Sequence, residues 1–475
     1  MGGNISRRQL FGIAGGAAVA TAALTACGSG SGDAAAVAVD AATSAATTTL
    51  GEQTDFVLHG DVCFSASQTE VSCTEDAYLV CKDGKSAGVF TELPSEYEGL
   101  PVLDCTGQLI VPGMSDIHLH APQYSFRGTG TDLELLDWLN IYTFPEEARY
   151  ADASYAEEAY DIFASDLRRS YTTRAVVFGT LHVEATELLM DKLDATGLVS
   201  YVGKVNMDRN GGENLQEETA DSLKATRQWL EDVAGKYERA KPILTPRFVP
   251  ACTDELMEGL QEIAAEQGLP IQSHLSENLS EIDWVKSLCP WSSCYGQAYD
   301  HFGMLGPTTV MAHCVYSSDE EVELLKSSGT YVAHCPQSNT MLSSGVAPIR
   351  RYLDEGIHVG LGTDVAGGAS LSMWRAAADA VNASKLRWRL VDQDLKALTS
   401  QEAFWLATLG GGSYFGRVGS FEEGYEFDAL VLDDSVLRSP RELSLWDRLE
   451  RFIYLEGEGG KLARKYVAGR EVSLA

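Results

Sequence analysis

Five side chains of the kinds that bind divalent metals lie at the ends of short apolar segments of this sequence. They are His118, His120, His274, His313 and Asp364. In an extended segment, residues two apart point the same way, so His118 and His120 can face one metal ion. An aspartate buried among histidines has a poor structural explanation, because an unpaired buried carboxylate is costly. A metal held by neutral histidines lowers the pKa of a bound water to about 7, so these residues predict hydrolytic chemistry.

The apolar segments that precede these residues alternate with amphipathic helical patterns. One such helix is expected to begin after an N-cap at Thr253 and to end at Gly268. Eight strand–helix units over about 300 residues predict an α/β fold with a (β/α)8 TIM-like barrel, whose sites form at the C-terminal ends of the strands. The predicted strands are Leu109–Val111, Ala175–Phe178, Tyr201–Val205, Ile243–Pro246, Ile271–His274, Val310–His313, Tyr331–His334 and Val359–Thr363.

Strand-rich segments flank the barrel pattern on both sides. Residues 55–108 show short alternating strand patterns separated by turn signals, and strand patterns return in residues 406–475. We expect the two flanks to join in one small β-sandwich beside a metal-dependent hydrolase barrel that spans residues 109–405. The chain is therefore expected to hold one barrel with an accessory unit rather than three separate domains.

The first residues have the pattern of a bacterial export signal. Arg7 and Arg8 precede an uncharged stretch, residues 10–26, that is too short and too polar to span a bilayer. The tetrapeptide Leu24-Thr-Ala-Cys27 then resembles a lipoprotein box, in which the cysteine is acylated. This pattern predicts a twin-arginine lipoprotein signal.

We expect residues 1–26 to be that signal and residues 27–54 to be a flexible linker, because the Ser, Gly, Ala and Thr run after Cys27 lacks apolar periodicity. Lipidation at Cys27 would anchor the mature protein. The N-terminus therefore predicts an exported bacterial protein that is extracytoplasmic and contacts the cell membrane through its lipid anchor only.

The composition narrows the class of partner. The chain has 475 residues, of which 45% are hydrophobic and 22% charged, and this excludes a disordered, collagen-like or coiled-coil protein. It carries 68 Asp and Glu against 36 Lys and Arg, for a formal net charge of -32. Such a field repels phosphate backbones, so it excludes nucleic acid as a partner and favours an uncharged small molecule.

Ten cysteines are too few for a disulfide scaffold in a chain of this length. If Cys27 is acylated, an odd number remains, so at least one thiol is free within the monomer. The candidate bridges are Cys289–Cys294 and pairs among Cys63, Cys73, Cys81 and Cys105. Their pairing stays open, because the sequence does not fix the connectivity.

The longer motifs around the metal-type residues resemble those of the guanine deaminases in the amidohydrolase superfamily. The resemblance extends from about Phe56 to the C-terminus. Its motifs are Pro112-Gly113 through His118-Leu-His120-Ala-Pro-Gln123, Tyr142-Thr-Phe144-Pro-Glu146-Glu, Pro246-Arg247-Phe248, His274-Leu-Ser-Glu277-Asn, Ala312-His313-Cys314-Val, Ala333-His334-Cys-Pro-Gln-Ser-Asn339 and Gly362-Thr363-Asp364-Val-Ala-Gly-Gly. The resemblance implies an enzyme that acts on a purine base.

The resemblance also implies roles around one divalent metal. The ligands it implies are His118, His120, His274 and Asp364. Zinc is expected, and iron stays open because histidine and carboxylate suit both. Asp364 would also accept the proton of the water, while Glu277 would carry protons to a ring nitrogen and then to ammonia. His313 would hydrogen-bond the attacking oxygen. A charge in the first turn of a helix is the structural alternative for Glu277.

Recognition of the ring is expected from a few polar and aromatic groups. Arg247 can donate a fork of hydrogen bonds to acceptors such as O6 and N7, while the Gln123 amide can both donate and accept. A surface ion pair is the structural alternative for Arg247, and a capping amide is the alternative for Gln123. Phe248 would supply an apolar wall, and His274 would also border the substrate. Two aromatic residues that either close over a planar base or pack in the core are Trp138 and Phe144.

The predicted reaction is the hydrolysis of guanine to xanthine and ammonia, with a free purine base as the partner. Two alternatives stay open. One is a deaminase of a related ring, such as 8-oxoguanine, a pterin or a triazine. The other is a non-catalytic, lipid-anchored purine-binding protein, which the complete set of site residues disfavours. The family resemblance also implies a homodimer.

Overall fold

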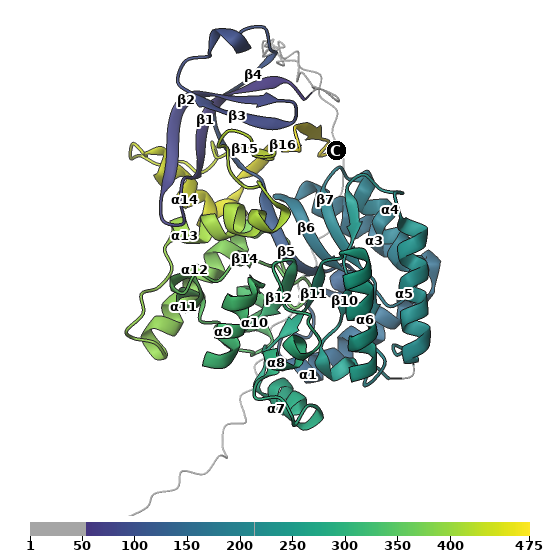
Figure 1. Cartoon of the computed structure of the whole chain (residues 1–475). Coiled ribbons are helices and arrows are strands. Elements are labelled where there is room, and N and C mark those ends of the chain that lie inside the picture. The colour runs from purple at the N-terminus through teal and green to yellow at the C-terminus, as the bar shows by residue number, and fades with distance from the viewer. Residues whose placement is uncertain (1–53, 213) are drawn as a thin grey trace, which may run out of the picture. The chain divides into compact units, whose positions relative to one another are not determined.

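A computed structural model describes residues 54–212 and 214–475 of the chain (Figure 1). Cys27, the predicted signal at residues 1–26 and the predicted linker up to residue 53 lie outside the described residues. Among the helices of the described part, none has both the length and the apolar character needed to cross a membrane.

Strands from both flanks of the barrel pattern form one seven-stranded sheet. They are β1 (Phe56–Ser65), β2 (Val71–Lys82), β3 (Lys85–Phe90), β4 (Val102–Pro112), β15 (Ala429–Asp433), β16 (Lys461–Val467) and β17 (Arg470–Val472). The strand order is β17-β16-β15-β4-β1-β2-β3, and the antiparallel pair of β4 and β15 joins the two flanks. The Phe56 ring packs 5.2 Å from Phe427 and 5.1 Å from Tyr466, centroid to centroid, inside a small core of this sheet.

The strands between these flanks pair in parallel. They are β5 (Met114–His120), β6 (Thr172–Phe178), β7 (Val199–Gly203), β8 (Val205–Asn206), β9 (Ala240–Pro242), β10 (Thr245–Pro246), β11 (Ile271–Leu275), β12 (Thr309–His313), β13 (Tyr331–His334) and β14 (Val359–Leu361). Their sheets are β5-β6-β7-β9, β8-β10 and β11-β12-β13-β14.

Backbone hydrogen bonds outside the regular strands link these sheets to one another. Gln272 N donates to Leu244 O at 2.9 Å, which joins β11 to the segment before β10. Asp364 N donates to His118 O at 2.8 Å, which joins the end of β14 back to β5. The parallel strands therefore form a TIM-like barrel beside the flanking sheet, and the predicted fold class is confirmed.

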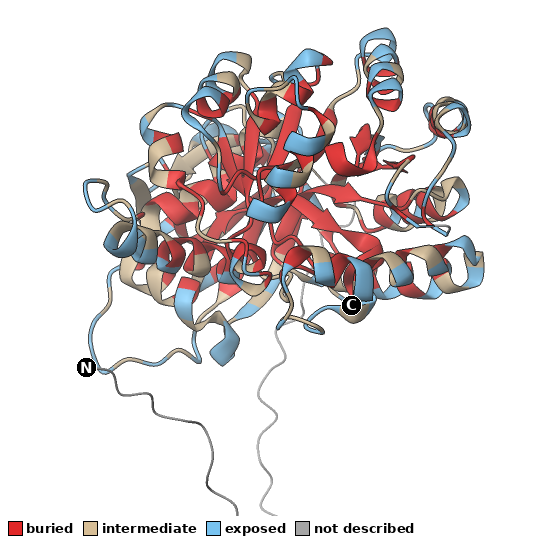
Figure 2. Ribbon diagram, turned by 90° about the horizontal axis from the view of Figure 1, so that it is seen from below, coloured by how far each residue is buried: buried red, intermediate tan, exposed pale blue. Residues whose placement is uncertain are grey.

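Helices surround the barrel strands. Figure 2 shows buried strands at the centre and helices with exposed outer faces. The α-helices of the described residues are α1 (Leu135–Trp138), α2 (Phe144–Glu147), α3 (Ala153–Arg169), α4 (Val183–Ala195), α5 (Thr219–Val233), α6 (Asp254–Gln267), α7 (Leu279–Leu288), α8 (Tyr295–His301), α9 (Asp319–Ser328), α10 (Pro336–Met341), α11 (Ile349–Asp354), α12 (Met373–Leu390), α13 (Ser400–Trp405) and α14 (Leu445–Leu455). Shorter 3-10 or π turns are η1 (Ser95–Tyr97), η2 (Ala121–Phe126), η3 (Leu139–Thr143), η4 (Ala148–Ala151), η5 (Val249–Ala251), η6 (Leu406–Gly410), η7 (Ser413–Phe415) and η8 (Glu456–Glu458).

The ends of helix α6 agree with the sequence prediction. The Thr253 side chain accepts a hydrogen bond from Leu256 N, which satisfies one of the free N–H groups of the first turn. Gly268 ends the helix in the left-handed conformation, with φ 65°. The predicted boundaries of this helix are confirmed, because both caps act through local chemistry that the sequence displays.

The first barrel strand lies further along the chain than predicted. Leu109–Val111, predicted as that strand, belongs to β4 of the flanking sheet, and β5 takes its place in the barrel. The two strands follow one another with only Gly113 between them, so apolar patterning did not separate them. A Cβ at Gly113 would lie 2.3 Å from Thr173 Oγ1 and 2.9 Å from Asp428 Cβ, so only glycine fits where the sheet meets the barrel.

Two buried cations tie the flanking sheet to the beginning of β6. The Arg174 guanidinium donates to both carboxylate oxygens of Asp428, at 2.7 and 2.8 Å. Lys465 on β16 donates from Nζ to Arg168 O at 2.7 Å and to Thr172 O at 2.9 Å. Burial lowers the pKa of Lys465 to about 7. These contacts are far along β6 from its C-terminal end.

The cysteines of the described residues are all free thiols. Cys63 on β1 and Cys73 on β2 are register partners across an antiparallel strand pair, yet they are not bridged. Cys289 and Cys294 are likewise unbridged. The described fold is therefore held together without any of the disulfides that the sequence left open.

Candidate metal and substrate site

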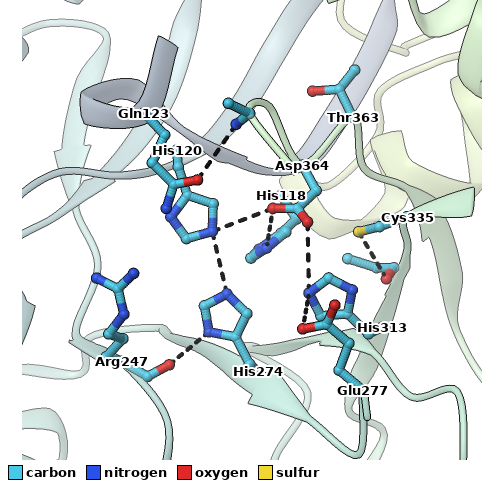
Figure 3. Close-up of polar contacts among 12 residues, drawn as sticks. His118, His120, Gln123, Arg247, His274, Glu277, His313, Cys335, Thr363 and Asp364 are labelled. Carbon is cyan, nitrogen blue, oxygen red and sulfur yellow. Dashed lines mark hydrogen bonds and ion pairs between the residues drawn. The ribbon is translucent and has the colours of Figure 1, made fainter. Parts of the chain in front are cut away.

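Four of the metal-type residues converge where barrel strands end (Figure 3). His118 and His120 lie on β5, His274 lies on β11, and Asp364 follows β14. The Nε2 atoms of His120 and His274 are 3.2 Å apart. Asp364 Oδ1 lies 3.2 Å from His118 Nε2 and 3.3 Å from His120 Nε2. The structure thus brings the four predicted ligands together around one point.

The surroundings of these atoms fit a divalent metal. His118 Nε2 is buried and, apart from its 3.2 Å contact with Asp364 Oδ1, has no hydrogen-bond partner among the described residues. His274 Nδ1 lies 2.6 Å from the carbonyl oxygen of Arg247, to which it can donate, and this leaves its Nε2 to coordinate. One nitrogen from each of His118, His120 and His274 lies within 4.8 Å of the other two. Imidazole and carboxylate donors of this kind suit zinc and iron.

Burial sets protonation states that suit a metal site. It lowers the pKa of His118 and His274, and it lowers the pKa of His120 to about 4, so the three imidazoles are neutral at pH 7. Burial opposes ionisation of Asp364, but the adjacent His118 helps to hold the pKa of that carboxyl well below its usual range. Neutral nitrogens and an ionised carboxylate are the forms that coordinate a cation.

A buried carboxylate that the sequence analysis missed, Asp116 on β5, fixes the ligand strands. Its Oδ1 accepts a hydrogen bond from Thr363 N at 3.0 Å, and its Oδ2 accepts one from Thr363 Oγ1 at 2.5 Å. Thr363 precedes Asp364, so this carboxylate ties the ligands of β5 to the ligand that follows β14. Strand alternation could have predicted its position, because it places Asp116 on the same side of the strand as His118 and His120.

Glu277 lies between β11 and α7 and is 3% exposed. Its Oε2 lies 3.5 Å from His313 Nε2, and its Oε1 accepts a hydrogen bond from Ser344 Oγ at 2.8 Å. Burial, reinforced by the charge of Asp364, raises the pKa of Glu277 to about 8. The predicted proton carrier therefore lies beside the ligand cluster, with its pKa raised toward neutral pH.

Other residues fill the role at the start of a helix that was the structural alternative for Glu277. Helix α7 is capped by Asn278 and Glu281, whose side chains and backbone N–H groups bond reciprocally. Glu281 also accepts from Glu277 N at 3.0 Å and from the Tyr295 hydroxyl at 2.9 Å. Glu277 is thus free of the capping role, and its carboxyl faces the cavity instead.

His313, the last residue of β12, completes the cluster. Its Nδ1 lies 2.9 Å from Asn339 Oδ1, while its Nε2 lies 3.5 Å from Glu277 and 3.8 Å from Asp364 Oδ2. His313 and Asp364 both have positive φ, 73° and 47°. This left-handed conformation costs about 1–3 kcal/mol for a residue other than glycine, and such strain gathers at functional sites.

A cavity adjoins the cluster. Its lining includes the predicted ring-binding residues Gln123, Arg247 and Phe248, together with Trp138. Gln123 is 2% and Arg247 3% exposed, so Arg247 does not form the surface ion pair that was its alternative. Phe144 packs behind Arg247, with its ring centroid 5.1 Å from the guanidinium carbon.

A second buried carboxylate links the two polar ring-binding residues. Glu147, at the end of α2, lies with its Oε2 2.5 Å from Arg247 Nη1. Its Oε1 accepts from Arg247 Nη2 at 3.1 Å and from Gln123 Nε2 at 2.9 Å. The sequence predicts no role for Glu147, because nothing in it shows which of Glu146 and Glu147 turns inward.

The chain belongs to the amidohydrolase family, whose model matches residues 109–471. Members of this family typically bind a divalent metal, as the histidine cluster also indicates. Within the family, the chain is similar to guanine deaminases over most of its length. The guanine deaminase of Dictyostelium discoideum is 40% identical over 406 residues, 84% of this chain and 88% of that protein.

Two further comparisons agree. The guanine deaminase of Rattus norvegicus is 41% identical over 379 residues, 77% of this chain and 83% of that protein. A crystal structure of guanine deaminase from C. acetobutylicum, with guanine bound in its active site, is 45% identical with a TM-score of 0.86, and the match covers 88% of this chain and all of that one. The resemblance inferred from the sequence motifs is confirmed.

The predicted location of the protein is wrong. The pattern of residues 7–27 predicted an extracytoplasmic, lipid-anchored bacterial protein. The matching relatives include eukaryotic guanine deaminases, such as those of Dictyostelium discoideum and Rattus norvegicus, and these do not support a bacterial lipoprotein. Cys27 lies outside the described residues.

Proposed function

We propose that this chain hydrolyses guanine to xanthine and ammonia. The observation that carries the proposal is one cavity bordered by ligand-cluster residues with Glu277 on one side and by Gln123 and Arg247 on the other. Similarity to a structure that holds guanine in its active site supports the same ring. The net charge of -32 suits a neutral free base rather than a base within a nucleic acid.

We propose that the ligand cluster holds one divalent metal, with zinc as the first candidate. His118, His120, His274 and Asp364 would hold it, because their coordinating atoms converge and His118 Nε2 has no other hydrogen-bond partner. When bound, such a metal supplies a Lewis acid that makes water a nucleophile at neutral pH. Iron suits the same donors, so metal analysis of the purified protein distinguishes the two.

Three side chains handle the protons of the proposed reaction. Asp364 accepts the proton that water loses as its oxygen bonds to C2 of the ring. Glu277 donates its proton to a ring nitrogen, takes up the proton of the hydroxyl now bonded to C2 and passes it to the amino group, so that the C=O bond forms as the C–N bond breaks and ammonia leaves; the proton held by Asp364 then returns to Glu277. His313, held by Asn339, hydrogen-bonds the attacking oxygen. One water is consumed and one ammonia released, which leaves xanthine.

The same cavity supplies the groups that orient the ring. Arg247 and Gln123 present N–H groups that match the acceptors O6 and N7 of guanine. Phe248 provides an apolar wall next to His274, with 6.4 Å between the ring centroids. Trp138 borders the cavity as well and also belongs to a buried apolar cluster with Leu139, so this side chain combines a place at the cavity with core packing.

Incubating the purified protein with guanine, while following ammonia and the purine spectrum, tests the proposal. Metal content is measured on the same preparation. Conversion to xanthine is the expected result, and no turnover at full metal content would refute it. Values of kcat/KM for 8-oxoguanine, a pterin and a triazine show whether a related ring is preferred. Tight guanine binding without conversion would instead indicate a binding protein.

We also propose that the protein is a homodimer, as the family resemblance implies. Light scattering coupled to size-exclusion chromatography measures the mass directly. A mass of twice the 51.3 kDa chain is expected, and a monomer at micromolar concentration would contradict the proposal.

A further inference from the structure

Glu147 is a buried carboxylate that the proposed chemistry does not use. It is 2% exposed and lies behind Gln123 and Arg247, outside the set of side chains that line the cavity. Burying a carboxylate is costly, so its retention there calls for a physical reason. We infer that Glu147 is a positioning residue that fixes the hydrogen-bond pattern offered to the ring and thereby selects a 6-oxo purine. The inference rests on the proposed function, because it assumes a purine in this cavity.

Glu147 sets the orientation of the Gln123 amide. Glu147 Oε1 accepts from Gln123 Nε2 at 2.9 Å, and a carboxylate has no proton to donate. The other end of the amide, Gln123 Oε1, accepts from Ala366 N at 3.4 Å. Turning the amide over would place oxygen against oxygen and N–H against N–H. Glu147 therefore fixes the amide in one orientation, with a second N–H left for the ring.

Glu147 also balances the charge of Arg247 and sets the direction of its guanidinium. Two of its five N–H groups point at Glu147, with Nη1 and Nη2 each facing a different oxygen. The other N–H groups remain available to a ligand. Because the carboxylate balances the guanidinium, this pair offers hydrogen-bond donors without a net charge. A neutral ring with acceptors at O6 and N7 is complementary to these uncharged donors.

The fixed donors of Gln123 and Arg247 discriminate between 6-oxo and 6-amino purines. A 6-amino purine places N–H groups where guanine has its O6 acceptor, so donors would face donors. A site built to bond one partner rejects an analogue that leaves its buried polar groups unpaired. Rejection of a 6-amino purine requires that the Gln123 amide cannot turn over and that the Arg247 guanidinium stays in place. The hydrogen bonds to Glu147 hold both side chains. The carboxylate thereby acts on the ring without touching it.

The test is Glu147→Gln in the full chain, assayed at equal metal content with guanine as substrate and 2,6-diaminopurine as competitor. A glutamine both donates and accepts, so Gln123 gains a second stable orientation. We expect KM for guanine to rise about 30-fold with kcat within about 3-fold of wild type. The ratio of the 2,6-diaminopurine inhibition constant to KM is expected to fall about tenfold or more.

Glu146→Gln is the matched control, because it makes the same change one residue away on α2. Glu146 bonds Tyr155 and Arg149 and is not part of the cavity. Its KM and inhibition constant are expected to stay within about twofold of wild type. A folded Glu147→Gln protein with wild-type KM and wild-type selectivity would overturn the inference. A loss of kcat alone, equal for every ligand, would overturn it as well.

Should Glu147→Gln fail to fold, as judged by its melting curve, Glu147→Asp replaces it. That variant keeps an acceptor-only group but withdraws it by one methylene, so KM is expected to rise while selectivity stays. An unchanged KM would overturn the inference. If wild-type protein does not convert guanine, the proposed function fails by itself. The affinity for guanine of wild-type and variant protein, measured by calorimetry, then tests Glu147 separately.

Discussion

At the scale of single residues, Arg247 serves both halves of the site. Its backbone carbonyl accepts from His274 Nδ1 and so orients a proposed metal ligand. Its side chain, held by Glu147, reaches the cavity where a ring would lie. A shift of this one residue would therefore disturb the metal cluster and the ring together, which explains why its guanidinium is fixed by two hydrogen bonds.

We expect Glu277→Gln to lower kcat for guanine by about 10³-fold while metal content stays at the wild-type level. Glutamine keeps the size of the side chain and an acceptor for Ser344, but it cannot carry the proton that the leaving amine needs. Ammonia release and metal analysis on one preparation measure both quantities. Ser344→Ala, which removes only the hydrogen bond, is expected to cost less than about tenfold. Near-normal turnover in Glu277→Gln would contradict the assignment.

Residue types and spacing predicted which side chains gather in the cluster, because their chemistry is visible along the chain. A histidine or aspartate that ends an apolar strand stands out without any knowledge of its neighbours. Glu147 could not be found this way, because α2 has four residues and no amphipathic period that points one side inward. Its role depends on Gln123 and Arg247, which approach it only in the folded chain.

At the scale of elements, strands and helices were predictable where their ends carry local signals. The apolar runs of β12 and β13 end in histidine, and α6 displays both of its caps. β4 and β5 were not separated, because what divides them is the contact of Gly113 with Thr173 and Asp428. That contact involves residues distant in sequence, which patterning along one segment does not reveal.

Lys465 on β16 makes the stability of the sheet dependent on pH. Its ordinary pKa is 10.5, and burial lowers its pKa to about 7. Below pH 7 both the folded and the unfolded chain bind the proton, and the full cost of burying the charge is present. Between pH 7 and 10.5 only the unfolded chain keeps the proton, so stability rises with pH by up to about 1.4 kcal/mol per unit.

We therefore expect Lys465→Met to lose stability relative to wild type as the pH rises from 7 to 9.5. The variant lacks the titrating group, so the gain that wild type makes over this range is absent from it. Urea denaturation at several pH values measures the difference in free energy of unfolding. Lys461→Met, at an exposed position of the same strand, is the control and should show a constant difference. A constant difference for Lys465→Met would contradict the expectation.

At the scale of the whole molecule, the flanking sheet and the barrel share one buried ion pair. Arg174 on β6 and Asp428 before β15 are both buried, and they meet through two hydrogen bonds. The sequence predicted that the two flanks would associate, but it gave no means of choosing these partners, because they lie 254 positions apart. The site occupies the C-terminal ends of the strands. The Arg174–Asp428 ion pair therefore stabilises the fold and takes no part in the proposed reaction.

We expect Arg174→Met to lower the free energy of unfolding by about 3–5 kcal/mol, because it leaves the Asp428 carboxylate buried and unpaired. The double variant with Asp428→Leu should recover part of that loss, since no lone charge remains. Urea denaturation of the wild type and both variants measures these values. Activity per folded molecule should be unchanged at 25 °C. A fall in kcat would show that the Arg174–Asp428 ion pair also affects the site.

The pairing of β4 with β15 also has a consequence for synthesis of the chain. β4 ends at Pro112, whereas β15 begins at Ala429, so more than half of the polypeptide is made between them. At about 5–20 residues per second, translation takes roughly 15 to 60 seconds to cover that distance. Throughout this interval β4 has an open edge, of the kind that joins other nascent strands. Each new molecule therefore has a period of exposure to misassociation that ends only when the ribosome has delivered its last strands.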